Sequence, residues 1–441
     1  MHVGGGTLRA LATGSLVVGA VLVTSLAGGS APAGATGAID VVTTCAGSGT
    51  GSLPAVVAAA ASGDTVTFAN GLSCPPGSPI TVTSTITVSL KGLKIVGPGA
   101  SSIAVSGGGA VPVFYFGSGE IDAISGLTIE NGSSTASCGT FGGSVVGGGI
   151  TNWGNLSVTD STITGNTGMG VDNNGVATIT NSTISGNSGP GYGDFTSAAS
   201  GYLVLTDSTL TGNGCGLYGG NDQQAVGGSV IAGNTVDCVF NNSLVTDLGY
   251  NLSDDPSCGG IGLLHQATDK TVPGGGVDLG PLRNNGGPTD TFLPGAGSPA
   301  FGAIPPGTTL GTTQACPRVD QRGVPSSGNC AIGAVEPFGV STRSLPNATP
   351  GTAYGTVTLS AQGEAASTSP NLTTLKWKKI TLPSGMKLTS AGVLSGTPSP
   401  KLTAGPSSVT IQLTETITTL SGTKKVKTKT TIQVTIPITL T

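Results

Sequence analysis

Asp160 and Asp207 occupy the same place in two copies of a short phrase, VTDSTITGN and LTDSTLTGN, and Asn181 takes that place in the copy between them. If each copy forms one rung of a coiled stack, rungs about 4.8 Å apart put the two carboxylates on the order of 9.6 Å from each other. That separation is near the upper limit for the acid and base of an inverting glycoside hydrolase. Asp and Asn are also common turn residues. The pair is therefore a catalytic candidate, and we favour turn formation.

A second line of acidic residues lies in the glycine-rich halves of the same copies, close to aromatic residues. Aromatic rings beside carboxylates can form a shallow sugar-binding strip. The alternative interpretation is solvated loops, which we favour. The carbohydrate-binding candidates are Trp153, Asp172, Tyr192, Asp194, Tyr218 and Asp222.

The sequence contains few groups that could hold a metal. Asp247, Asn251, Asp254 and Asp255 offer the oxygen ligands that calcium prefers, but their spacing matches no calcium loop. His265 is the only histidine after residue 35, which excludes a histidine-based zinc site or catalytic triad. We therefore expect no cofactor, with calcium left open. The glycines form no phosphate loop, and basic charge is confined to one small segment, so we expect no nucleic-acid partner.

A lyase acting on acidic sugars is disfavoured by the distribution of cations. Such an enzyme needs a strong base, commonly Arg or Lys, beside carboxylates that hold calcium. From Ile95 to Asp269 the chain has no Arg and no Lys. An acidic surface without cations would repel a polyanionic substrate.

One phrase is repeated four times between Leu156 and Thr235, and its copies close on asparagines at intervals of 21, 26 and 21 residues. Self-similarity at this period, built from β-branched residues without several leucines per unit, indicates a parallel β-helix. The stacked asparagines can hydrogen-bond from one rung to the next. The closing asparagines are Asn166, Asn187, Asn213 and Asn234. The apolar residues expected to stack inside the coil are Val158, Ile163, Ile179, Ile184, Leu205 and Leu210.

The N-terminal residues indicate export. Arg9 precedes the apolar run Leu11 to Ala27, and the small-residue pattern Ala33 to Ala35 follows, which is typical of a signal peptide over residues 1–35. A retained membrane anchor, the alternative, requires a longer uninterrupted run. We expect a secreted, extracellular or cell-surface protein with no membrane span after cleavage. After the signal, residues 52–61 (SLPAVVAAAA) predict a short apolar helix that plugs the first end of the solenoid.

All eight cysteines follow the signal, which suits an oxidising compartment. Proximity in the chain suggests Cys45 with Cys74, Cys238 with Cys258, and Cys316 with Cys330. Cys138 and Cys215 then remain as the fourth pair. Eight cysteines allow 105 connectivities, so this pairing is one hypothesis among many.

Two stretches carry a resemblance to known bacterial proteins. GSLPAVVAAAASGDTVTF, ITVTSTITV, LKIVGPGA and ISGLTIENG resemble the N-terminal half of secreted right-handed β-helix proteins of the pectate-lyase-like kind. LGPLRNNGGPTDTFLPGAGSPA and DQRGVPSSGNCAIGAVE, between Leu279 and Glu336, resemble the closing segment of choice-of-anchor Q domain proteins. Where that family usually reads SPAIDAG and DIGAYE, this chain has SPAFGAI and AIGAVE. Two acidic positions are lost, so no role of those carboxylates can be carried over.

The composition changes near residue 337. LPNATPGTAY and LPSGMKLTSAGVLSGTP resemble the Ig-like domains of bacterial surface proteins, which implies a β-sandwich spacer or adhesive module with Trp377 in its core. Residues 338–441 hold ten basic and two acidic side chains, a balance of +8, against -12 for the rest. The lysines could face an anionic wall polymer or the acidic solenoid; alternatively, they protect edge strands from aggregation. These lysines are Lys376, Lys378, Lys379, Lys424, Lys425, Lys427 and Lys429.

The sequence thus predicts an all-β protein: a signal peptide (1–35), a right-handed parallel β-helix (36–337) with a closing segment (279–336), and an Ig-like sandwich (338–441). We expect a non-catalytic adhesion or carbohydrate-contact protein, with a polysaccharide or cell-wall polymer as partner. The alternative is a glycoside hydrolase that acts on a neutral polysaccharide through the solenoid carboxylates. The sequence does not indicate an oligomeric state.

Overall fold

The computed structural model describes residues 37–89, 92–98, 103–119, 121–139, 146–194, 201–220, 222–241, 243–285, 289–295, 297–316, 318–326, 329–336, 338–340, 342, 345–362, 372–421 and 424–441. The predicted signal peptide over residues 1–35 lies outside the described residues. In the part of the chain that is described, no helix is long and apolar enough to cross a membrane.

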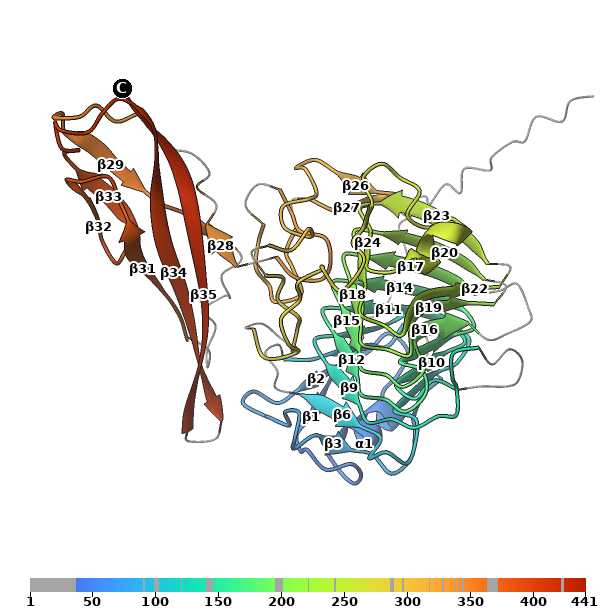
Figure 1. Ribbon diagram of the computed structural model, residues 1–441. Coiled ribbons are helices and arrows are strands. Elements are labelled where there is room, and N and C mark those ends of the chain that lie inside the picture. The colour runs from blue at the N-terminus through green and yellow to red at the C-terminus, as the bar shows by residue number, and fades with distance from the viewer. Residues whose placement is uncertain are drawn as a thin grey trace, which may run out of the picture. The chain divides into compact units, whose positions relative to one another are not determined.

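From β1 to β25, between Ile39 and Thr271, the described chain forms a parallel β-solenoid of about eight coils, which confirms the predicted fold class (Figure 1). Successive strands of a coil lie in three different parallel sheets. Sheet 1 contains, in spatial order, β1 (Ile39–Val42), β2 (Thr65–Phe68), β5 (Lys94–Val96), β8 (Ile121–Ser125), β11 (Asn155–Thr159), β14 (Val176–Thr180), β17 (Tyr202–Thr206), β20 (Gln223–Gly227) and β23 (Leu244–Gly249). Sheet 2 contains β4 (Ile86–Val88), β7 (Phe114–Phe116), β10 (Ile150–Asn152), β13 (Val171–Asn173), β16 (Pro190–Asp194), β19 (Cys215–Gly219) and β22 (Val236–Phe240). Sheet 3 contains β3 (Ile80–Thr81), β6 (Ala104–Ser106), β9 (Thr128–Glu130), β12 (Thr162–Thr164), β15 (Thr183–Ser185), β18 (Thr209–Thr211), β21 (Val230–Ile231), β24 (Leu252–Ser253) and β25 (Lys270–Thr271).

The apolar residues of the repeat stack in register inside the coil, as predicted. Val158 lies opposite Ile179, which lies opposite Leu205, and all three are fully buried. Ile163, Ile184 and Leu210 form the equivalent column in sheet 3. Burial of each such side chain contributes about 2 kcal/mol to stability relative to exposure.

Polar side chains form hydrogen-bonded ladders along the turns, and the predicted asparagine ladder is confirmed. Each asparagine donates from Nδ2 to Oδ1 of the next: Asn166 to Asn187 at 2.9 Å, Asn187 to Asn213 at 2.9 Å, and Asn213 to Asn234 at 3.0 Å. Because Asn166, Asn187 and Asn213 are buried, these bonds satisfy amide groups that water cannot reach. A parallel ladder links backbone amides to serine hydroxyls through Ser161, Ser182, Ser208 and Ser229.

The helix predicted at residues 52–61 is present as α1 (Leu53–Ala59). Ser52 caps it by accepting a hydrogen bond from the amide of Ala55, and Pro54 fits the first turn. It buries Leu53 and Val57 in the solenoid core. At the other end, the 3-10 helix η1 (Pro256–Ile261) packs beside β22.

The closing segment does not continue the coil. Its regular structure is a small antiparallel pair, β26 (Thr309–Leu310) with β27 (Thr313–Gln314). Long-range hydrogen bonds hold the rest against the turns between sheets 1 and 3, for example from Thr162 Oγ1 to the Asp290 carbonyl at 2.6 Å.

The C-terminal strands are antiparallel and compatible with a β-sandwich. They bury Trp377, as predicted, together with Leu394, Ile411 and Ile436. The domain boundaries and the Ig-like assignment stay predictions. The strands are β28 (Gly339–Val340) with β30 (Ala361–Gln362); β29 (Tyr354–Thr358), β33 (Val393–Gly396) and β32 (Met386–Leu388); and β31 (Leu372–Thr381), β34 (Gly405–Ser421) and β35 (Lys424–Leu440).

Candidate functional site

A pocket of about 320 Å³ lies on the outer face of sheet 2. Its floor follows one column of outward-facing residues, because Thr87 of β4, Tyr115 of β7 and Thr151 of β10 lie opposite one another in register. Residues that precede these strands in the chain, Thr85, Pro112 and Val146, line the sides of the pocket. The described lining residues are Thr85, Thr87, Pro112, Tyr115, Val146 and Thr151.

The described lining of this pocket is uncharged. Among the described lining residues none is charged, Tyr115 is half-buried with a partly accessible ring, and the three threonines are hydroxyl donors and acceptors. Thr151 is fixed on the floor, since its Oγ1 accepts a hydrogen bond from the Gly147 amide at 2.8 Å. An aromatic ring with a few placed hydroxyls can bind a polar, uncharged ring. Tyr115 is not among the predicted site residues, although its place in FYF, between two inward phenylalanines, indicates an outward ring.

The predicted sugar-binding strip is not on the surface. Trp153 is 42% exposed, but Tyr192 and Tyr218 are fully buried. Their three acidic companions, Asp172, Asp194 and Asp222, are buried as well. Tyr192 points into the coil, where its hydroxyl accepts a hydrogen bond from Asn173 Nδ2 at 3.0 Å. The buried rings therefore cannot stack on a sugar, and of the six candidates only Trp153 is available to one.

Burial also changes the protonation of these carboxyls. Removal from water raises the pKa of Asp172 to about 8, because the hydrogen bond from Asn174 does not offset desolvation and the nearby Asp194 raises the pKa further. Asp222 has a pKa raised to about 6 by the same cause, although Ser243 and Gln224 donate to it. Asp172 is therefore mainly protonated near neutral pH.

Asp160 and Asp207 form left-handed turns rather than an open carboxylate pair. Both have positive φ, 49° and 51°, as has Asn181 between them at 48°. Asp and Asn tolerate this conformation better than other residues with a Cβ atom, which explains their alternation at one position of the repeat. Asp207 is buried and Asp160 half-buried, so the geometry gives the predicted catalytic pair no shared open cleft.

The closing segment covers this column of turns. Asn181 donates from Nδ2 to the Val319 carbonyl at 2.8 Å and accepts from Arg318 Nη1 at 2.8 Å. Arg318 also lies 3.6 Å from Asp207 Oδ1, with both side chains buried. Desolvation raises the pKa of Asp207 to about 6, although Arg318 lowers it. The closing segment thus supplies Arg318, a cation that the repeat lacks, but this side chain is buried and paired with Asp207.

A buried polar network holds the closing segment in shape, and the sequence did not reveal it. Arg322 donates to both Asp320 Oδ2 (2.8 Å from Nη2) and the Glu336 carbonyl (2.6 Å). Arg318 lies 3.5 Å from Glu336, whose carboxylate also accepts from the Ala331 amide. We call Arg318, Asp320, Arg322 and Glu336 the clasp. The clasp residues lie in the phrases DQRG and AIGAVE and just before them, and because these phrases do not repeat, the sequence suggests no partner for them.

Gln321 anchors the clasp to the solenoid. Its Oε1 accepts from Thr183 Oγ1 at 2.7 Å, and its Nε2 donates to Thr162 Oγ1 at 3.1 Å. One side chain thereby joins two successive rungs to the closing segment.

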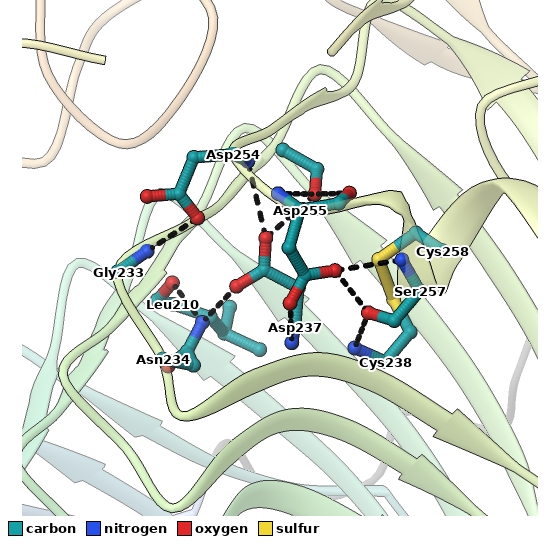
Figure 2. Close-up of a disulfide and its surroundings, with 10 residues drawn as sticks. Leu210, Gly233, Asn234, Asp237, Cys238, Asp254, Asp255, Ser257 and Cys258 are labelled. Atoms are coloured by element: carbon teal, nitrogen blue, oxygen red, sulfur yellow. Dashed lines mark hydrogen bonds between the residues drawn. A yellow bond between two sulfur atoms is a disulfide. The ribbon is translucent and has the colours of Figure 1, made fainter. Parts of the chain in front are cut away.

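The weak calcium candidates cap the last rungs of the solenoid (Figure 2). Asp255 accepts from the amides of Asp237 and Ser257, and Asp254 accepts from the Gly233 amide at 2.9 Å. Asp237 in turn accepts from Asn234 Nδ2 at 3.0 Å, which ends the asparagine ladder. These carboxylates take the hydrogen bonds that a further rung would take.

Of the other two calcium candidates, Asn251 ends the serine ladder, because its Oδ1 accepts a hydrogen bond from the Ser229 amide at 3.3 Å. Asp247 accepts from Asn251 Nδ2 at 3.1 Å and from the His265 amide at 2.7 Å. Across the described residues, no group of three or more His, Cys, Asp or Glu side chains is placed to hold a metal ion. Calcium binding by Asp247, Asn251, Asp254 and Asp255 stays a prediction.

The prediction that the solenoid has an acidic surface is wrong. Most carboxylates of the solenoid and closing segment lie inside the protein, so repulsion from an acidic face cannot decide its substrate. The lack of Arg and Lys between Ile95 and Asp269 still leaves the central rungs without an accessible strong base. The buried acidic residues are Asp64, Asp122, Glu130, Asp172, Asp194, Asp207, Asp222, Asp237, Asp320 and Glu336.

All four predicted disulfides are present: Cys45–Cys74, Cys138–Cys215, Cys238–Cys258 and Cys316–Cys330. They brace the first coil, the outer face of sheet 2, the last coil and the closing segment. No family model and no curated protein matches this chain, so the fold and the local chemistry carry the functional argument.

Proposed function

We propose that this chain is a secreted or cell-surface, non-catalytic protein whose solenoid contacts neutral carbohydrate through the pocket over β4, β7 and β10. The observation that carries the proposal is the uncharged lining of that pocket, with the Tyr115 ring among threonine hydroxyls. Neutral sugars present C–H faces to aromatic rings and hydroxyls to short polar side chains.

The placement of the carboxylates supports binding without turnover. A glycoside hydrolase needs an acid and a base on opposite sides of one accessible bond. Asp207 is buried against Arg318, and Asp172, Asp194 and Asp222 are also buried. Asp207 forms a turn, and the other three carboxyls lie inside the protein, where a substrate cannot reach them.

A β-helix fits a pectate-lyase-like protein, and four disulfides are compatible with an extracellular location. We further propose that the chain is of the choice-of-anchor Q type with a C-terminal Ig-like module. The closing phrases LGPLRNNGGPTDTFLPGAGSPA and AIGAVE support this assignment.

The test is binding of residues 36–441 to an array of neutral and acidic glycans, followed by titration calorimetry with the best neutral oligosaccharide. Tyr115→Ala should weaken binding at least tenfold. Tyr202→Ala is the matched control, because Tyr202 is an exposed tyrosine on the outer face of a different sheet. Equal loss in both variants, or no neutral glycan bound, would overturn the proposal.

A further inference from the structure

The outer face of the three-stranded sheet β31-β34-β35 carries a row of lysines. Trp377 of β31 is buried, so its neighbours Lys376 and Lys378 point to the opposite, exposed side. Lys376 pairs with Thr414 of β34, which pairs with Thr431 of β35. These three residues therefore share the exposed face.

The lysines of β35 belong to the same face. Lys425, Lys427 and Lys429 are exposed and lie six, four and two residues before Thr431, so they have its orientation. Two residues of a strand span about 6.8 Å and neighbouring strands lie about 4.8 Å apart, so the row from Lys425 to Lys378 is roughly 30 Å long. Five lysines thus share this face, three along β35 and two farther along on β31.

Between the lysines the face carries hydroxyls. Thr414 and Thr431 share a hydrogen bond at 3.0 Å, and Thr374 and Thr416 lie beside them in register. Glu415 is on the opposite side of the sheet and 1% exposed. The described residues of this face include no acidic and no aromatic side chain.

We propose that this lysine row binds a linear polyanionic glycan bearing carboxylates or phosphates. A row of lysines without acidic neighbours attracts a polymer that carries repeated negative charges. Threonine hydroxyls suit a glycan, whereas single-stranded nucleic acid is bound with stacking aromatics that this face lacks. The solenoid of a second copy is a poor partner, because most of its carboxylates are buried. Because β31 and β35 are the two edge strands of this sheet, the alternative role of these lysines is protection against edge-to-edge pairing, which predicts no binding to a polyanionic polymer.

The experiment measures binding of fluorescent polygalacturonate and of a glycerol-phosphate polymer to residues 36–441 at several salt concentrations. Lys427→Gln/Lys429→Gln should weaken the preferred polymer at least tenfold at low salt. It should also reduce the slope of log Kd against log salt by about two fifths, since two of five contacts are lost. The two polymers distinguish carboxylate from phosphate recognition.

The matched control is Lys387→Gln/Lys401→Gln, which removes two exposed lysines from elsewhere in the C-terminal region and changes the net charge equally. It should weaken binding less than threefold, and Tyr115→Ala should have no effect, since this row is independent of the sugar pocket. Equal loss in both double variants would overturn the proposal. So would absence of binding to both polymers, preference for duplex DNA, or self-association that Lys427→Gln/Lys429→Gln alone abolishes.

Discussion

At the scale of single residues, aspartates of identical sequence context have different surroundings. Asp160 and Asp207 share a phrase and a left-handed turn, yet Arg318 lies beside Asp207 alone. Asp207→Asn keeps the turn but leaves the buried guanidinium with Glu336 as its remaining acidic partner. We expect a loss of about 1–3 kcal/mol in the free energy of unfolding, measured by urea denaturation. Asp160→Asn should cost less than about 0.5 kcal/mol. Equal losses would contradict the assigned ion pair.

The central asparagine of the ladder permits a second test. Asn187 accepts from Asn166 and donates to Asn213 inside the protein. Asn187→Ala should destabilise the protein by about 2 kcal/mol or more, because it leaves buried polar groups without partners. Asn155→Ala, on the outer face of sheet 1, is the control and should change stability by less than about 1 kcal/mol. A loss at Asn187 no larger than that at Asn155 would show that the ladder adds little.

At the scale of elements, the closing segment depends on its clasp. Arg322→Met removes the side chain that joins Asp320 to the Glu336 carbonyl. Breaking a buried pair costs about 3–5 kcal/mol. Here we expect that loss to appear first as local opening, with faster hydrogen exchange over residues 318–336 and unchanged exchange in β11 to β18. Uniform acceleration throughout the solenoid would contradict a local role.

The sequence predicted the elements of the solenoid better than the contacts between distant segments. Ile163 and Ile184 were placed correctly because alternation and period determine which way a strand residue points. Alternation does not reveal what covers an outward residue. Asn181 contacts Val319, and Gln321 contacts Thr162, across more than a hundred residues without any repeat that links them. Likewise, the residues around Tyr218 in the sequence do not indicate that other residues cover its side chain.

At the scale of the whole molecule, buried carboxyls make stability depend on pH. Desolvation raises the pKa of Asp172 to about 8 and that of Glu336 to about 7, and several other aspartates are raised to about 6. Between pH 4 and 8 the folded protein therefore binds more protons than the unfolded chain. The stability gained from keeping these carboxyls protonated is complete at about pH 4 and is lost as the pH rises through their raised pKa values.

We predict that the free energy of unfolding is higher at pH 5 than at pH 8 by more than about 2 kcal/mol, measured by urea denaturation at fixed pH. Asp172→Asn should flatten the profile most between pH 6 and 8, because it removes the highest of these pKa values. Stability that rises towards pH 8 would mean that these carboxyls are ionised and accessible.

The most direct test of the central claim, that the solenoid carboxylates serve structure and the protein binds without turnover, is reducing-sugar release. Residues 36–441 are incubated with a panel of neutral and acidic polysaccharides between pH 4 and 8, and binding is measured on the same samples. We predict binding to a neutral glycan that depends on Tyr115, with no reducing ends released above the protein-free blank. Release that Asp160→Asn and Asp207→Asn abolish, in variants that remain folded, would contradict the claim and establish a glycoside hydrolase.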